Sequence, residues 1–247
     1  MTATPDPLAA LATLDAFEAL VRSRRSVRRF SPRAPSDELV ARLVDCARLA
    51  PSGYNLQPTH VVVVTDPATR RRLAAACMDQ RAVEVAPVVA VFVGDRDVAR
   101  THADSLQADL DAGAIDAAYA ARMRRVVPLA FRTGPLGIGW LWKALLPPFV
   151  RWFRPVPSIP AVARRAWLGK QAGLMAMTYL LAARAAGLDA VPMEGFDDRR
   201  VRSVLGIPRR YVPLIVVPTG YASDELPVTA PRRTRRPLAS VLHRERF

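Results

Sequence analysis

The sequence contains very little cysteine, and it has no long apolar run. Cys46 and Cys77 are the only cysteines among 247 residues, and neither belongs to a CxxC pair, which argues against a disulfide framework or a zinc ribbon. Each lies in an apolar helical context, which is typical of a buried free thiol in a reducing compartment. A run of about 18 apolar residues is absent, so a membrane-spanning helix is not expected. Residues 1–17 also lack the pattern of a signal peptide, so we expect a cytoplasmic protein.

Lysine is almost absent too, although the chain is strongly basic. Lys143 and Lys170 are the only lysines, while the formal net charge is +14 and the pI is about 11.2, so nearly all of the positive charge is arginine. Such a charge favours anionic partners, namely nucleic acid, a membrane surface or a phosphorylated ligand. A general preference for arginine, in a chain also rich in Ala, Pro and Val, explains the excess equally well. Both interpretations of the charge stay open.

Familiar catalytic and metal-binding motifs are missing. The sequence has no GxxxxGK[ST] and no HExxH motif. His60, His102 and His243 fall in separate segments, so a histidine metal site is not expected. We therefore assign neither a metal nor a catalytic side chain. Hydrophobic residues make up 51% of the chain, which is enough for a substantial core.

Periodicity and apolar runs predict a single α+β domain over residues 1–247, with a polar tail at 223–247. The predicted helices are 8–21, 36–49, 66–78, 97–127 (in large part), 161–187 and 197–205. The predicted strands are 60–65, 87–94 and 212–217. The first two strands are continuous apolar runs, which suggests burial on both faces. Helix 161–187 has little polar surface, so it is expected in the core or at a subunit interface.

Four segments combine groups that suit one kind of ligand. They are RRSVRRF (24–30), PSGYNLQP (51–58), VPMEGFD (191–197) and RRTRRPL (232–238). Guanidinium forks and hydroxyls bind phosphate. Side-chain amides and a tight glycine turn suit the edge and face of a planar heterocycle. Together the segments are compatible with a phosphorylated heterocyclic cofactor.

In their order and spacing these segments resemble the nitroreductase family of FMN-dependent oxidoreductases, over residues 17–236. The resemblance implies a central mixed β-sheet surrounded by helices. It also implies a homodimer with two FMN sites at the subunit interface, and a C-terminal tail exchanged onto the partner.

The resemblance also implies the residues of the cofactor site. Near the phosphate, the ribityl chain and the N1/O2 edge of the flavin it places Arg24, Arg25, Ser26 and Arg28. From the other subunit it brings Pro51, Ser52, Gly53, Asn55 and Gln57. Around the central ring it places Pro192, Met193, Glu194 and Gly195, with a backbone N–H near N5. It places Arg233 and Arg235 of the tail over the phosphate. Family members often have a polar and a basic residue just before the second strand, and Gln80 and Arg81 are the nearest candidates here.

The function implied is transfer of hydride from NADH or NADPH through flavin N5 to an organic acceptor, such as a nitroaromatic or a quinone, with ping-pong kinetics. An alternative is a flavin-dependent dehydrogenase, or another member of the family that reduces no nitro compound. An arginine-rich nucleic-acid-binding protein is the alternative from another class, but the basic segments are not interleaved with stacking aromatics. We expect a small-molecule acceptor as substrate and no nucleic-acid partner.

An aromatic-rich insertion at 134–157 has no counterpart in this scheme. Residues 137–153 hold three of the four tryptophans, interrupted by a proline pair and two cations. Three roles stay open, namely an arm that contacts the dimer partner or covers the core, a lid over an apolar acceptor pocket, and a segment that dips into a membrane interface.

Overall fold

The computed structural model describes residues 7–131, 143–145, 149–153, 155, 162–223 and 233–247. The helices of more than one turn are α1 (Pro7–Ser23), α2 (Asp37–Arg48), α3 (Pro67–Ala76), α4 (Arg81–Val85), α5 (Val98–Asp111), α6 (Ala117–Phe131), α8 (Arg164–Ala185) and α9 (Asp198–Leu205). Short 3-10 helices are η1 (Gly53–Asn55) and η3 (Leu238–Ser240). The strands are β1 (Thr59–Val64), β2 (Val88–Asp95), β3 (Asp189–Ala190) and β4 (Tyr211–Gly220). Much of the aromatic-rich insertion lies outside the described residues.

The four described strands form one sheet in the order β1-β2-β4-β3, and each neighbouring pair is antiparallel. Parallel pairing occurs at the isolated bridge between Ser26 and Ala190. The parallel component of the expected mixed sheet is therefore limited, in the described part of the chain, to this one bridge. β3 has two residues, which is too short for the periodicity of the sequence to reveal it.

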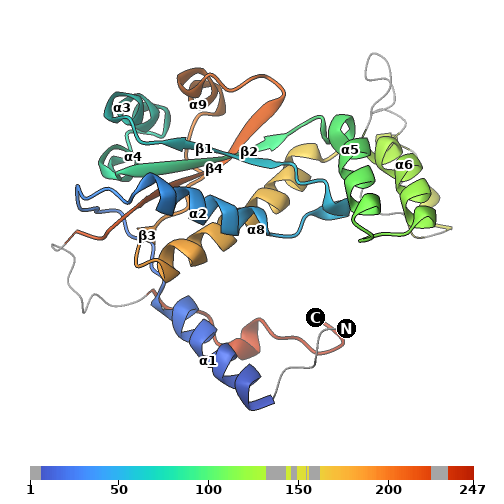
Figure 1. The fold of residues 1–247 in the computed structure, drawn as a ribbon, viewed down its shortest axis with the longest axis horizontal. Helices are drawn as coiled ribbons and strands as arrows, with labels where there is room; N and C mark the ends of the chain where they lie inside the picture. The colour runs from blue at the N-terminus through green and yellow to red at the C-terminus, as the bar shows by residue number, and fades with distance from the viewer. Residues whose placement is uncertain (1–6, 132–142, 146–148, 154, 156–161, 224–232) are drawn as a thin grey trace.

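Helices cover both faces of the sheet, and β2 runs through the middle (Figure 1). Val89, Val91 and Val93 pack in the core on the side of α3, α4 and α9. Ala90 and Phe92 pack in the core on the side of α2 and α8. Successive side chains of a strand point to opposite faces, so an unbroken apolar run is what a strand covered on both sides requires.

The prediction of two-sided burial is confirmed for β2 and wrong for β1. β1 forms the edge of the sheet, and its residues are mostly half-buried or exposed, with Val63 at 40% exposure. An apolar run indicates that a strand is hydrophobic, but the position of that strand in the sheet decides how much of its surface other elements cover.

Side-chain caps set several helix ends where the sequence indicated them. Ser36 Oγ accepts the Leu39 N–H at the start of α2, at 3.2 Å. Asp197 accepts two backbone N–H groups at the start of α9. Gly187 adopts a φ of +75° just after α8, a left-handed conformation that glycine reaches without a steric cost. Each of these end signals involves residues only a few positions apart, which is why the helix boundaries predicted from the sequence lie close to them.

Helices α5 and α6 pack against each other beside the sheet around a smaller core that includes Leu106, Met123 and Phe131 (Figure 1). None of the helices in the described part of the chain is long and apolar enough to cross a membrane.

Candidate cofactor site

The arginine-rich stretch 24–30 lies along one end of the sheet. Val27 and Phe30 are buried in the same core as α3 and α9, at 8% and 7% exposure. Ser26 bridges to Ala190 in β3, and Phe30 bridges to the chain just after β4. Two buried apolar side chains thus hold the backbone of the stretch, and Arg28 stays exposed.

The charge at this end of the sheet is mostly positive. Arg184 pairs with Asp189, with its Nη1 3.3 Å from Oδ1, and its Nε donates to Ser23 Oγ at 3.0 Å. Burial raises the pKa of Asp189, and the nearby charges of Arg184, Arg25 and Arg24 oppose that rise. Three guanidinium groups therefore face one carboxylate, an excess that favours an anion such as a phosphate.

Gln80 and the turn at 192–195, two separate parts of the predicted site, meet in the structure. Gln80 Nε2 donates to the Gly195 carbonyl at 2.9 Å. Met193 is 7% exposed and exchanges both backbone hydrogen bonds with Val216 in β4, so the turn is tied to the sheet. Within the described part of the chain, the N–H groups of Glu194 and Gly195 donate to no backbone carbonyl. They are available for the edge of a heterocycle, and this fits a flavin. Arg81 and Pro192 lie beside these residues and are exposed.

The loop 51–58 is held from two sides by residues far away in sequence. The Gly53 N–H donates to Gln171 Oε1 at 2.8 Å, and Gln171 is 8% exposed on α8. Asn55 Nδ2 donates to Asp109 at the end of α5, at 3.0 Å to Oδ2. Asn55, Ser52, Gly53 and the other predicted site residues of this loop thus form one group, supported by α8 and α5.

Backbone strain coincides with the predicted site segments. Among the described residues, the non-glycine positions with positive φ are Tyr54, Asn55, Gln57, Met78, Asp79 and Glu245. All but the last lie in the loop 51–58 or immediately before Gln80. Such conformations cost about 1–3 kcal/mol each and persist where the surroundings enforce them. Here Ser52 Oγ accepts the Gln57 N–H at 2.9 Å, which is one such restraint.

A hollow of about 220 Å³ lies under this loop, between α2, β1 and α8. Ser52, Gln57, His60 and Gln171 line it together with Thr59, whose Oγ1 is buried without a hydrogen-bond partner. Gln171, His60 and Thr59 were absent from the sequence prediction. Only Gln171 carried a signal, an amide within an otherwise apolar helix, and its partner was unknown until the fold was.

The arginine stretch and the loop 51–58 lie at opposite ends of the sheet within one chain. Ala190, the bridge partner of Ser26, pairs with Thr219, which pairs with Val88 at the start of β2. Thr59, which follows the loop, pairs with Gly94 near the end of β2. Six strand residues at about 3.4 Å each separate the two levels by roughly 20 Å. One chain therefore keeps these two predicted half-sites apart.

In the described residues, no hydrogen bond or ion pair joins Arg233 or Arg235 of the tail to the arginine stretch 24–30 or to the loop 51–58. Arg233 and Arg235 are exposed, and Arg235 Nη1 donates to the carbonyls of Arg233 and Thr234 at 3.3 and 3.1 Å. Their expected role over the phosphate stays a prediction.

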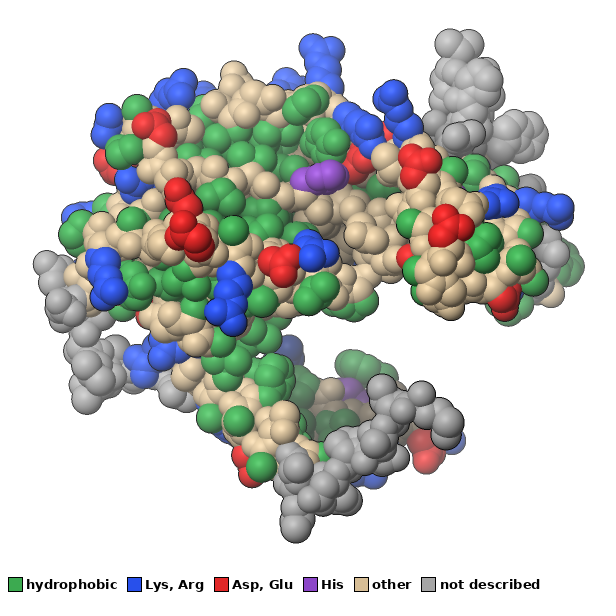
Figure 2. Space-filling view, in the orientation of Figure 1, with side chains coloured by type: hydrophobic (Ala, Val, Ile, Leu, Met, Phe, Trp, Pro, Cys, Tyr) green, Lys and Arg blue, Asp and Glu red, His purple; other side chains and the backbone are tan. Residues whose placement is uncertain are grey.

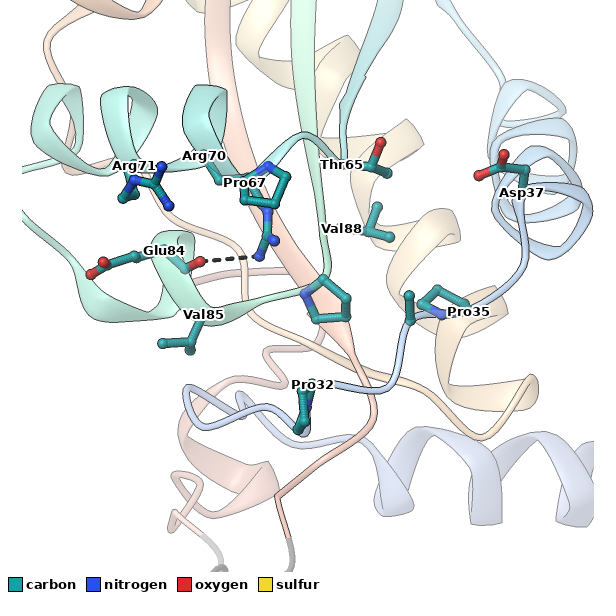
Figure 3. A pocket seen from close by; sticks show the side chains of 12 residues that line it. Pro32, Pro35, Asp37, Thr65, Pro67, Arg70, Arg71, Glu84, Val85 and Val88 are labelled. Atoms are coloured by element: carbon teal, nitrogen blue, oxygen red, sulfur yellow. Dashed lines mark hydrogen bonds between the residues drawn. The ribbon is translucent and has the colours of Figure 1, made fainter.

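A further hollow of about 480 Å³ lies beside residues 32–37, and none of the predicted site residues lines it (Figure 3). Prolines line much of it, and Arg70 donates to the Glu84 carbonyl at 3.1 Å, which caps the end of α4. Burial lowers the pKa of Arg70, mainly by desolvation. The larger volume does not make this the functional site, because it contains none of the groups that converge on a cofactor.

The fold defines a class, an α+β protein with helices on both faces of one sheet (Figure 1). The model of the Nitroreductase family matches residues 21–221. An NADH dehydrogenase from Thermus thermophilus is 33% identical over 217 residues, which cover 88% of this chain and 91% of that protein. An oxygen-insensitive NAD(P)H nitroreductase from Salmonella typhimurium is 28% identical over 231 residues, covering 88% and 96%.

Solved structures agree on the fold. A nitroreductase-like protein from Streptococcus mutans superposes with a TM-score of 0.71 at 25% identity, covering 93% of this chain and 98% of that one. A protein from Exiguobacterium sibiricum, solved in complex with FMN, gives a TM-score of 0.70 at 22% identity, covering 93% and 97%. The chain belongs to the nitroreductase family, and it is an oxidoreductase of that family.

Proposed function

We propose that the protein is an FMN-dependent oxidoreductase that takes electrons from NADH or NADPH and reduces an organic acceptor, such as a nitroaromatic or a quinone, by a ping-pong mechanism. The relatives' names include NAD(P)H, and FMN is the ligand of the Exiguobacterium protein. Bound FMN supplies the hydride-transfer chemistry. The observation that carries the proposal is the contact between Gln80 and the turn 192–195, in a sheet to which the arginine stretch is also tied through Ser26 and Ala190.

Each group of residues has a task that its surroundings support. Arg24 and Arg25, close to Asp189, which pairs with Arg184, offer charge to the phosphate, with the Ser26 hydroxyl next to them. Arg28 is exposed and available to the electron-accepting edge of the ring, where a fixed cation stabilises negative charge. The N–H groups of Glu194 and Gly195, which donate to no described backbone carbonyl, are available to the edge of the ring near N5. No side chain of this chain is assigned as an acid or base.

We further propose a homodimer in which each flavin receives the loop 51–58 from the second subunit, since one chain keeps the two half-sites apart. Exposed apolar side chains support a partner surface. On α1, Leu11, Leu14 and Phe17 are 57%, 56% and 50% exposed. On α8, Leu174 and Met177 are 46% and 41% exposed, so this helix, although apolar, is not covered on all sides within one chain. Patches of this kind typically mark interfaces.

A flavin-dependent dehydrogenase is the second candidate, favoured by the name of the Thermus relative. The two candidates share one site and differ in the physiological acceptor. We retain the cytoplasm as the compartment, because both cysteines are free thiols.

The experiment is the absorption spectrum of the purified protein, followed by anaerobic addition of NADPH or NADH. We expect flavin bands that bleach with donor and return with a quinone or nitroaromatic. Arg25→Gln should weaken FMN binding about tenfold or more, since it removes a charge-assisted contact. Arg22→Gln is the matched control, because Arg22 pairs with Glu18 on α1. A colourless protein that takes up no added FMN would refute the proposal.

A further inference from the structure

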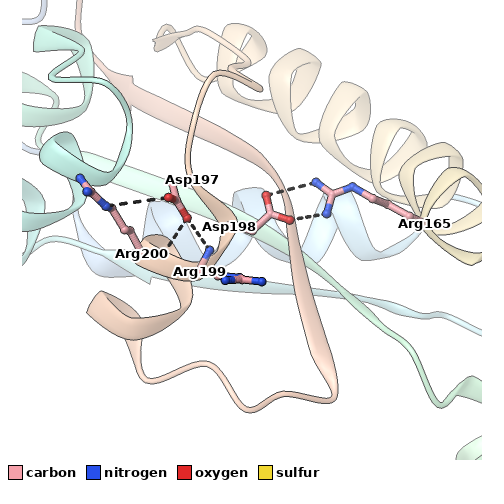
Figure 4. Close-up of polar contacts among 5 residues, drawn as sticks. All are labelled: Arg165, Asp197, Asp198, Arg199 and Arg200. Carbon is pink, nitrogen blue, oxygen red and sulfur yellow. Dashed lines mark hydrogen bonds and ion pairs between the residues drawn. The ribbon is translucent and has the colours of Figure 1, made fainter.

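Four arginines from three elements gather at the other end of the sheet, and one of them pairs with a carboxylate. Arg165, in the first turn of α8, donates through both Nη atoms to Asp198 on α9, one of them at 3.2 Å (Figure 4). Arg202 lies four residues after Asp198, on the same face of α9. Burial lowers the pKa of Arg96, in the turn after β2, and the charges of Arg202, Arg165 and Arg164 lower it further. The four guanidinium groups are therefore electrostatic neighbours.

The cluster formed by Arg96, Arg164, Arg165 and Arg202 has more guanidinium donors than hydrogen-bond acceptors among the described residues. Asp198 is engaged by Arg165, and within the described part of the chain neither Arg96 nor Arg202 forms an ion pair. Arg164 Nη2 donates to the Phe131 carbonyl at 2.7 Å, but its Nε is buried without a partner. Arg202 Nε is likewise buried without a partner. A buried donor without an acceptor is costly, and an anion placed between these groups would relieve that cost.

The surroundings increase the positive potential. The first turn of α8 carries two arginines and no acidic residue, so the positive end of the helix dipole adds to the side-chain charges. Lys143 is near enough to Arg164 for the two charges to interact, and together with burial this lowers the pKa of Lys143. One carboxylate does not balance these charges.

We propose that Arg96, Arg164, Arg165 and Arg202 bind a phosphoryl dianion carried by a small molecule. Guanidinium forks match phosphate geometry, and a dianion matches the excess charge. Arg202, Arg165 and Arg164 all lie within electrostatic reach of Arg96, and this compact grouping favours a small ligand over a nucleic-acid backbone.

The site is distinct from the one proposed for the flavin phosphate in the same chain. Arg96 directly follows Asp95, the last residue of β2, whereas the arginine stretch lies level with Val88 at its beginning. Strand geometry puts roughly 25 Å between the two levels. The two anion sites can therefore be filled and mutated independently.

The test uses the full-length protein saturated with FMN and titrated calorimetrically with inorganic pyrophosphate at constant ionic strength. Flavin absorbance is followed in parallel, so that displacement of FMN is detected. We expect saturable binding without loss of flavin, weakened about tenfold or more in Arg202→Gln. Arg199→Gln is the matched control on the same helix, because Arg199 is exposed and outside the cluster, and it should stay within about twofold of wild type.

Arg96→Gln is a second variant that guards against misfolding, because Arg96 is an exposed turn residue, and it should weaken pyrophosphate in the same way. Absence of saturable binding, or equal weakening by Arg199→Gln, would overturn the proposal. So would loss of binding in Arg25→Gln, which would assign the pyrophosphate to the flavin site. Duplex DNA or anionic vesicles that bind the cluster far more tightly than pyrophosphate, with steep salt dependence, would overturn the small-ligand assignment.

Discussion

Replacing Gln171 with leucine tests how the loop 51–58 is held in shape. Gln171 is 8% exposed, and its Oε1 accepts the Gly53 N–H at 2.8 Å. Leucine keeps the approximate size of the side chain but removes the acceptor, which costs about 1–2 kcal/mol where the N–H stays partly buried. Tyr54, Asn55 and Gln57 have positive φ, each at a cost of about 1 kcal/mol or more, so the lost bond is comparable with the strain it opposes. The loop should therefore relax.

We expect the free energy of unfolding to fall by about 1–2 kcal/mol and Tm by about 3–6 °C, measured by calorimetry. The dissociation constant of FMN, measured by fluorescence titration, should rise about tenfold. Lys170→Met, at the exposed neighbouring position of α8, is the control and should change neither quantity. An unchanged FMN affinity in a destabilised Gln171→Leu protein would show that the loop does not contribute to flavin binding.

Three further predictions concern the scaffold. In Gly220→Ala the new Cβ would lie 2.6 Å from the rigid ring of Pro87, so the free energy of unfolding measured by chemical denaturation should fall by about 1–3 kcal/mol. An unchanged denaturation midpoint would contradict this packing. Arg210→Ala leaves Asp95, which is 3% exposed and 2.7 Å from Arg210 Nε, buried without its ion-pair partner. The free energy of unfolding measured in urea should therefore fall by about 3 kcal/mol, whereas the control Arg209→Ala, at an exposed position, should lower it by about 0.5 kcal/mol or less. Burial raises the pKa of Cys77 to about 11 from 9.0, so stability should fall from pH 9 to 11, where only the unfolded thiol ionises, and Cys77→Ser should flatten that slope.

Local signals accounted for most of the elements. The predicted helices 36–49 and 197–205 begin at Ser36 and Asp197, the residues that cap α2 and α9, and the apolar run 87–94 predicted β2 closely. A similar apolar run led to a wrong prediction of two-sided burial for β1, because a strand's own residues do not reveal that it lies at the edge of the sheet. The two residues of β3 and the five residues of α4 were not predicted for a simpler reason, since segments that short show no period.

The site was foreseen as four segments but not as an arrangement. The four motifs and their order along the chain indicated the family. Gln80 and Gly195, 115 positions apart in the sequence, are hydrogen-bonded in the structure. Gln171 was missed, since its partner Gly53 is 118 positions away, and the hollow beneath the loop has no sequence signature. The arginines around Asp198 were equally hidden among 36 basic residues.

The sequence by itself determined the helices, the buried central strand and the chemical character of the cofactor segments, because caps, periodicity and side-chain type act over a few neighbouring residues. Only the tertiary structure decided that the arginine stretch and the loop 51–58 form separate half-sites at opposite ends of the sheet. It also decided which of the many arginines converge without acceptors. Strand order, register and helix packing bring distant residues together, and each of these depends on the whole chain at once.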